Sequence, residues 1–108
     1  MPVTLLSSRA IAELQPRAAE AAELLAAMAN PKRLLILCNL LDRERSVSEL
    51  SELIGLAQSP LSQHLAVLRE EGLVATRRES QTIFYRIADP AAAKIIATLA
   101  EIYCPQPE

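Results

Sequence analysis

Apolar residues recur at three- to four-residue spacing in the first third of the chain, a pattern that predicts helices. Residues 8–28 form the first helical segment, in which Pro16 indicates a break or a fresh start. A second helix is expected to follow Asn30, a good N-cap residue with a proline directly after it, and to run to about Leu41. The polar run DRER at 42–45 is predicted to form a loop.

Two helices separated by a tight turn are predicted in the middle of the chain. Ser46 and Glu49 match a capping box, so a short helix should begin there and end near Gly55. For the next helix we expect Ser59 as the N-cap and Pro60 at the first helical position. The buried stripe of that helix is predicted to be three leucines, namely Leu61, Leu65 and Leu68.

A β-hairpin and a final helix complete the pattern. LVATRR and TIFYRIA are rich in β-branched and aromatic residues and flank the polar turn ESQ. Asp89, followed by a proline, is expected to cap a last helix at about 90–104. This order predicts a mainly α fold with a small β-hairpin, a winged helix-turn-helix, in one domain at 1–108 with a reading unit at about 46–72 and a wing at about 73–88.

The composition indicates the oligomeric state. Half of the 108 residues are apolar, which suggests more apolar surface than a monomer of this size can cover, so we expect a dimer. A stripe of small residues in the first helical segment either packs in the core or forms a dimer seam. Its members are Ala18, Ala22, Leu25 and Ala29, widened by Leu24 and Met28.

Charge and hydropathy limit where the protein acts. The net charge of −2 argues against a DNA binder driven by bulk positive charge, but it does not exclude a local basic patch. The longest strongly apolar run, LLILC at 34–38, is too short to cross a membrane, and the chain shows no pattern of a signal peptide. We therefore expect a cytoplasmic protein without membrane contact, whose cysteines are thiols.

The predicted helix-turn-helix indicates binding to double-stranded DNA. In such a unit the second helix enters the major groove and its N-terminal residues touch base edges. Here those residues are Ser59, Ser62, Gln63 and His64. Glutamine can pair with adenine through two hydrogen bonds, and serine can serve a base or a phosphate. Each of these residues taken alone is also typical of an ordinary helix start or surface.

The predicted wing carries three arginines, Arg77, Arg78 and Arg86, that can bind phosphates or enter the minor groove. From 59 to 86 the chain has four arginines and three glutamates, a weak positive balance for a DNA surface. Arg77 and Arg78 taken alone favour a solvated strand face. The order and spacing of the wing and of the second helix of the helix-turn-helix, here called the reading helix, together favour DNA binding.

These segments resemble one bacterial family. NPKRLLIL, SPLSQHLAVLREEGLV and RRESQTIFYRI are similar to the ArsR/SmtB winged-helix repressors, and the resemblance covers roughly residues 20–104. It implies a homodimer joined by the first and last helices, at about 8–29 and 90–104. It also implies repression of transcription that an inducer relieves.

The inducer has to be sought in the sensing residues. Where many members of the family carry a metal-binding Cys-x-Cys motif, this chain has SELSELIG, and its last helix has no histidine. A set of three or four zinc ligands is not visible, so neither a metal site nor a cofactor is expected. The two cysteines, Cys38 and Cys104, lie far apart in sequence, and the residues alone favour their interpretation as buried small hydrophobes.

The resemblance to one branch of the family favours a functional role for the two cysteines. The persulfide- and sulfide-responsive repressors known as BigR and SqrR carry one cysteine in the second helix and one near the end of the last, and Cys38 and Cys104 fall on those positions. The resemblance implies a thiol pair that senses reactive sulfur species through an intrachain di- or polysulfide bridge, weakening operator binding and derepressing sulfide-detoxification genes. Three alternatives stay open, which are a soft-metal or arsenite sensor, a general thiol redox sensor, and a DNA-binding dimer with inert cysteines. A thiol enzyme is disfavoured because no base or histidine accompanies either cysteine.

Overall fold

The structure is a computed structural model that describes residues 7–104, so both ends of the predicted 1–108 domain lie outside the described residues. Within residues 7–104, no helix is long and apolar enough to cross a membrane. The helices and strands follow one another in the order α1 Ser8–Leu14, the 3₁₀ turn η1 Gln15–Arg17, α2 Ala18–Met28, α3 Pro31–Asn39, β1 Arg45–Ser46, α4 Val47–Ile54, α5 Gln58–Glu70, β2 Val74–Glu79, β3 Thr82–Ile87 and α6 Pro90–Tyr103. The predicted winged helix-turn-helix is therefore confirmed.

Side-chain caps fix three of the helix starts as the sequence predicts. Asn30 Oδ1 accepts from the N–H groups of Lys32 and Arg33, at 2.9 and 3.1 Å. Ser46 forms the capping box of α4, and Asp89 accepts from the backbone at the start of α6. These caps satisfy N–H groups that a helix leaves without partners at its N-terminus.

The start of α5 differs from the prediction, because Ser59 is not its N-cap. The helix begins at Gln58 with Ala57 as the N-cap residue, and that end has no side-chain cap. Pro60 therefore occupies the third helical position, where its missing N–H costs nothing because the first turn has no helical acceptor. Proline in the first turn does not fix which residue begins the helix.

The wing is a three-stranded antiparallel sheet in the order β1-β3-β2. Strands β2 and β3 form the predicted hairpin, with a two-residue turn in which Ser80 has a positive φ of 59°. Strand β1 lies at the edge of the predicted loop and was not expected. It pairs Arg45 with Tyr85 and Ser46 with Phe84.

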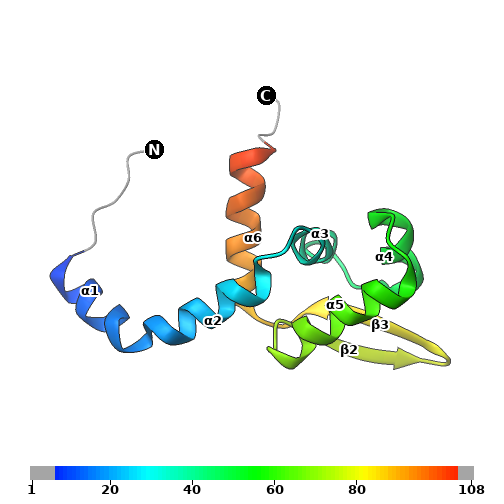
Figure 1. Cartoon of the computed structure of the whole chain (residues 1–108), viewed down its shortest axis with the longest axis horizontal. Coiled ribbons are helices and arrows are strands. Elements are labelled where there is room, and N and C mark those ends of the chain that lie inside the picture. Colours follow the sequence, from blue (N-terminus) through cyan, green and yellow to red (C-terminus); the bar gives the residue numbers. More distant parts are fainter. Residues whose placement is uncertain (1–6, 105–108) are drawn as a thin grey trace.

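The core lies between α3, α4, α5, α6 and the base of the wing. The three predicted leucines of α5 are completely buried, and they belong to one hydrophobic cluster with residues of the other elements. The core also contains Ile36, Leu37, Leu50, Leu73, Val74 and Ile96. Ile102, near the C-terminal end of α6, is 62% exposed because α6 extends beyond the core (Figure 1).

The N-terminal helices form an arm that leaves the core (Figure 1). No residue of α1 is buried, and α2 reaches the core only near its C-terminal end, through Leu24, Ala27 and Met28. The small-residue stripe lies on the other side of the helix. Its members Ala18, Ala22, Leu25 and Ala29 are all exposed, so the stripe does not pack in the core of a single chain.

Candidate functional site: reading helix, wing and cysteine pair

A tight turn sets α5 at an angle to α4. Gly55 ends α4 in the left-handed region, with φ 73°, and its N–H donates to Ser51 O at 2.9 Å. The Ser51 hydroxyl then donates to Leu56 O at 2.6 Å, across the turn. A residue with a side chain is strained at such a φ, so glycine suits this position.

The predicted base-reading residues occupy the outer side of α5, opposite its leucines. Ser59, Ser62 and Gln63 are exposed, whereas His64 is half-buried. Arg33 Nη1 lies 3.4 Å from His64 Nδ1 and its Nε donates to Ala27 O at 2.6 Å. Because a guanidinium only donates, His64 Nδ1 accepts in this contact.

The three arginines predicted on the wing lie on two different faces, because the strand register separates them. Side chains alternate along a strand and cross-strand partners share a face. Arg77 is paired with Phe84 and Ala75 is paired with Arg86, so both of these arginines lie on one face. Arg78 lies on the opposite face, on the side of Tyr85.

The face of Arg77 carries a partner that the sequence did not reveal. Arg77 Nε donates to Glu44 Oε1 at 2.6 Å, and its guanidinium lies 4.7 Å from the centre of the Phe84 ring. The hydrogen bond from Arg77 lowers the pKa of Glu44, and the nearby charge of Arg86 also lowers it. Both arginines therefore face a carboxylate of their own chain.

The face of Arg78 is different. Among residues 7–104 no carboxylate forms an ion pair with Arg78. On the same side of the wing, Tyr85 and α5 form an open groove, which is lined by Ser62, Ala66, Arg69, Glu70 and Tyr85. Arg78 and the outer side of α5 are thus the exposed polar groups at this face.

The two cysteines lie on helices that pack against each other. Cys38 lies near the end of α3, which packs against α6, and Cys104 follows the last residue of α6. Both are exposed and both are free thiols. Partial burial raises the pKa of Cys38, and the charge of a Cys104 thiolate raises it further. The thiol pair therefore lies on two helices that pack against each other.

Within residues 7–104, no three histidine, cysteine, aspartate or glutamate side chains gather closely enough to hold a metal ion.

Comparison with known proteins identifies the family. Residues 30–76, which span α3, the helix-turn-helix and the first residues of the wing, match the family described as "Bacterial regulatory protein, arsR family". The transcriptional activator HlyU of Vibrio cholerae is 52% identical over 92 residues, which cover 85% of each chain. This chain belongs to the ArsR family.

Solved structures of ArsR-family regulators share the fold. The structure of reduced HlyU from Vibrio cholerae has a TM-score of 0.81 at 52% identity, covering 85% of this chain and 97% of that one. The transcriptional repressor BigR from Xylella fastidiosa has a TM-score of 0.83 at 44% identity, covering 89% of this chain and 98% of that one. The chain is therefore a DNA-binding transcriptional regulator with a winged helix-turn-helix, and not an enzyme.

Proposed function

We propose that this ArsR-family regulator is a dimeric repressor that releases its operator when Cys38 and Cys104 react with a persulfide or polysulfide. The observation that carries the proposal is that α3 and α6, which carry the two thiols, pack against each other and leave both thiols free and exposed. One of the similar structures is described as reduced HlyU and another as the repressor BigR. The description of HlyU as reduced supports a redox-dependent role of the cysteines, and the description of BigR as a repressor supports repression.

Exposed apolar residues on the arm and on α6 support a dimer. Ile11, Leu14 and Leu25 are each about half exposed, at 46, 50 and 52%. Ile102 and Tyr103 are exposed at the far end of α6. Such residues along two protruding helices are typical of a surface that a second chain covers. We therefore assign the predicted ranges 8–29 and 90–104 to dimerisation.

The outer side of α5 suits the major groove. We propose that Ser59, Ser62, Gln63 and His64 contact bases or phosphates there, as the sequence predicts. The N-terminus of α5 has no side-chain cap, and a helix N-terminus without one favours a phosphate through its N–H groups and dipole.

The three wing arginines have different roles in this proposal. Arg78 contacts phosphate directly because no carboxylate among the described residues competes for it. Arg77 and Arg86 face Glu44, so they contribute to DNA binding chiefly by holding the wing in place.

The proposed chemistry balances with a persulfide, RSSH, as the oxidant. A cysteine thiolate attacks the outer sulfur of RSSH, the S–S bond breaks, and RS⁻ leaves a cysteine persulfide behind. The second thiol then attacks the inner sulfur of that persulfide and expels H₂S, leaving a disulfide. If both cysteines have become persulfides, their condensation expels one H₂S and leaves a trisulfide. In the first case the sulfane sulfur of RSSH is reduced to H₂S, whereas in the second case two RSSH are consumed, one sulfane sulfur is reduced to H₂S and the other stays in the trisulfide.

Bridging affects DNA binding through the helices that carry the cysteines. Helix α3 packs against α4 and α5, and α6 lies at the proposed dimer interface. The two reading helices of a dimer must match half-sites about 34 Å apart, so a small shift of α3 relative to α6 misplaces both. The bridged protein then binds the operator more weakly.

Two serine variants test the proposal. Cys38→Ser and Cys104→Ser remove one sulfur atom each, and both proteins should bind the operator as the reduced wild type does but fail to respond to a persulfide donor. Fluorescence anisotropy with DNA from the promoter of the protein's own gene measures the response. A full response from Cys38→Ser contradicts the proposal. Release of DNA by arsenite, but not by the donor, would indicate a soft-metal sensor instead.

A further inference from the structure

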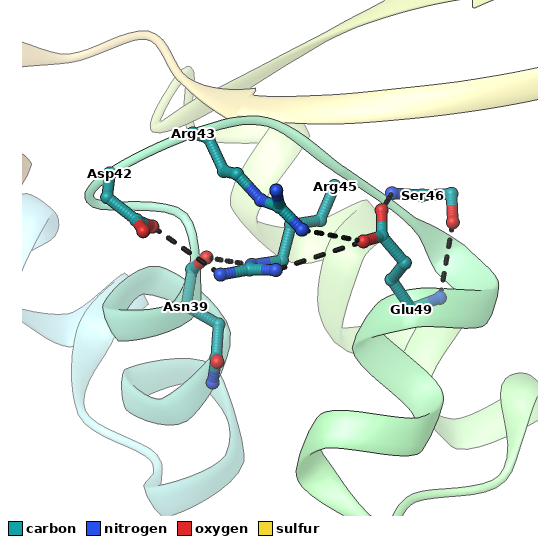
Figure 2. A network of polar contacts seen from close by, with 6 residues as sticks. All are labelled: Asn39, Asp42, Arg43, Arg45, Ser46 and Glu49. Atoms are coloured by element: carbon teal, nitrogen blue, oxygen red, sulfur yellow. Dashed lines mark hydrogen bonds and ion pairs between the residues drawn. The ribbon is translucent and has the colours of Figure 1, made fainter.

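An arginine next to the helix-turn-helix contacts both this unit and the helix that carries Cys38. Arg45 lies between the end of α3 and the start of α4 (Figure 2). Its side chain is only 15% exposed, although it carries a full charge. A buried guanidinium is costly unless acceptors surround it, so the contacts of Arg45 require an explanation.

The first contact fixes the end of the helix that carries Cys38. Arg45 Nε donates to Asn39 O at 2.6 Å, and Asn39 is the last residue of α3. The last carbonyls of a helix have no partner within the helix, and a cation near them also complements the helix dipole. Arg45 Nη2 lies 3.5 Å from Asp42 Oδ1 in the loop that follows α3. Cys38 directly precedes the residue that Arg45 holds.

The second contact fixes the start of the helix-turn-helix. Arg45 Nη1 lies 3.8 Å from Glu49 Oε2, while Glu49 Oε1 accepts from the Ser46 N–H at 3.1 Å. The Ser46 hydroxyl in turn accepts from the Glu49 N–H at 3.2 Å. Glu49 therefore belongs both to the capping box of α4 and to the ion pair with Arg45, as Figure 2 shows.

The backbone of Arg45 provides a third connection. As part of β1 it pairs with Tyr85 of β3, the central strand of the wing. Tyr85 lines the groove beside α5. One residue thus contacts the end of the thiol-bearing helix, the first turn of α4 and the middle of the wing.

We propose that Arg45 is the positioning residue that transmits the state of the Cys38–Cys104 pair to the DNA-reading unit. This inference rests on the function proposed above. A bridge at Cys38 pulls on the last turn of α3 and thereby moves the Asn39 carbonyl. The guanidinium group of Arg45 follows this carbonyl, and Arg45 in turn shifts the capping box and β1. Arginine suits this role because its planar fork offers donors in fixed directions to several acceptors at once.

The test compares Arg45→Met with Arg43→Met. Arg43 donates to the same Glu49 carboxylate at 3.1 Å, but it is 61% exposed and none of its contacts reaches α3. Both variants lose one positive charge. Operator affinity is measured for the reduced and the donor-treated form of each protein, and intact mass confirms that the bridge forms. The ratio of the two affinities is the readout, because a merely structural defect changes both forms alike.

The wild-type ratio should lie in the range of allosteric couplings, about 5- to 150-fold. Arg45→Met should bring the ratio close to one although the bridge still forms, Arg45→Lys should restore part of it, and Arg43→Met should keep it. An unchanged ratio in Arg45→Met overturns the inference. A wild-type ratio of one despite bridging overturns the proposed function instead, so the two failures are distinguishable.

A measurement on the wild type covers the case in which Arg45→Met does not fold. Hydrogen exchange of the Ser46 and Glu49 amides reports the capping box directly, because the backbone N–H of each residue donates to the side chain of the other. Bridging should accelerate both amides relative to the Gly55 amide, which bonds within α4 away from Arg45. Equal exchange before and after bridging overturns the inference.

Discussion

Replacing Arg78 by alanine is expected to reduce the salt dependence of operator binding more than replacing Arg77 by alanine. Both substitutions remove one positive charge from the same strand, so a mere change in net charge affects them alike. The two differ in what the guanidinium contacts. Arg77 already bonds Glu44 and lies over the Phe84 ring, whereas Arg78 lies on the other face without an ion pair among residues 7–104.

The size of the effect follows from counterion release. Each phosphate that a protein neutralises contributes about 0.9 to the slope of log affinity against log salt, so two copies of Arg78 in a dimer contribute about 1.8. Between 50 and 200 mM salt, the wild type should therefore lose about tenfold more affinity than Arg78→Ala does. Arg77→Ala should keep nearly the full slope and instead lose the ion pair with Glu44 that anchors the wing.

Anisotropy titrations of the operator at four salt concentrations measure both slopes. Circular dichroism and size-exclusion chromatography should show that each variant keeps its fold and its oligomeric state. Equal changes of slope in the two variants, or a larger change in Arg77→Ala, would refute the assignment of the wing faces.

Substitutions at three further positions test packing, backbone and thiol chemistry. Leu65→Ala removes a completely buried side chain and should lower the free energy of unfolding by about 2–5 kcal/mol in a urea titration, while a cost below 1 kcal/mol would contradict its place in the core. Gly55→Ala should cost about 1–2 kcal/mol through its left-handed φ alone, since an added Cβ meets no atom within 4 Å, and Gly55→Asn should cost less. In Cys104→Ser, burial still raises the pKa of Cys38, so its alkylation should increase with pH and reach half its maximum at a higher pH than for a free cysteine. An equal or lower midpoint would contradict the burial of that thiol.

Local chemistry explains why most helix starts were predictable. Asn30, Ser46 and Asp89 each bond a backbone N–H two or three residues ahead, so the signal lies within a few residues of sequence. Ser59 has the same chemical type but lies inside the first turn of α5, because Pro60 is tolerated anywhere in that turn. The residue type alone could not distinguish these two cases.

Tertiary pairing explains what the sequence could not predict. Strand β1 has only two residues, too few for an alternating pattern, and it exists because β3 offers an edge. The bond from Arg77 to Glu44 joins residues 33 positions apart and depends on how the wing returns to the loop after α3. The cysteines were recognisable as a pair only through a family resemblance, since the packing of α3 against α6, which carry them, is a tertiary contact.

Operator binding by the wild-type protein, with intact mass read on the same samples, tests the central claim most directly. Fully reduced protein is compared at fixed salt with protein treated with a persulfide donor. The account predicts a loss of affinity that follows the formation of a bridge between Cys38 and Cys104, with the mass showing how many sulfur atoms it holds. Unchanged affinity of fully bridged protein would contradict it and make the thiols bystanders to DNA binding.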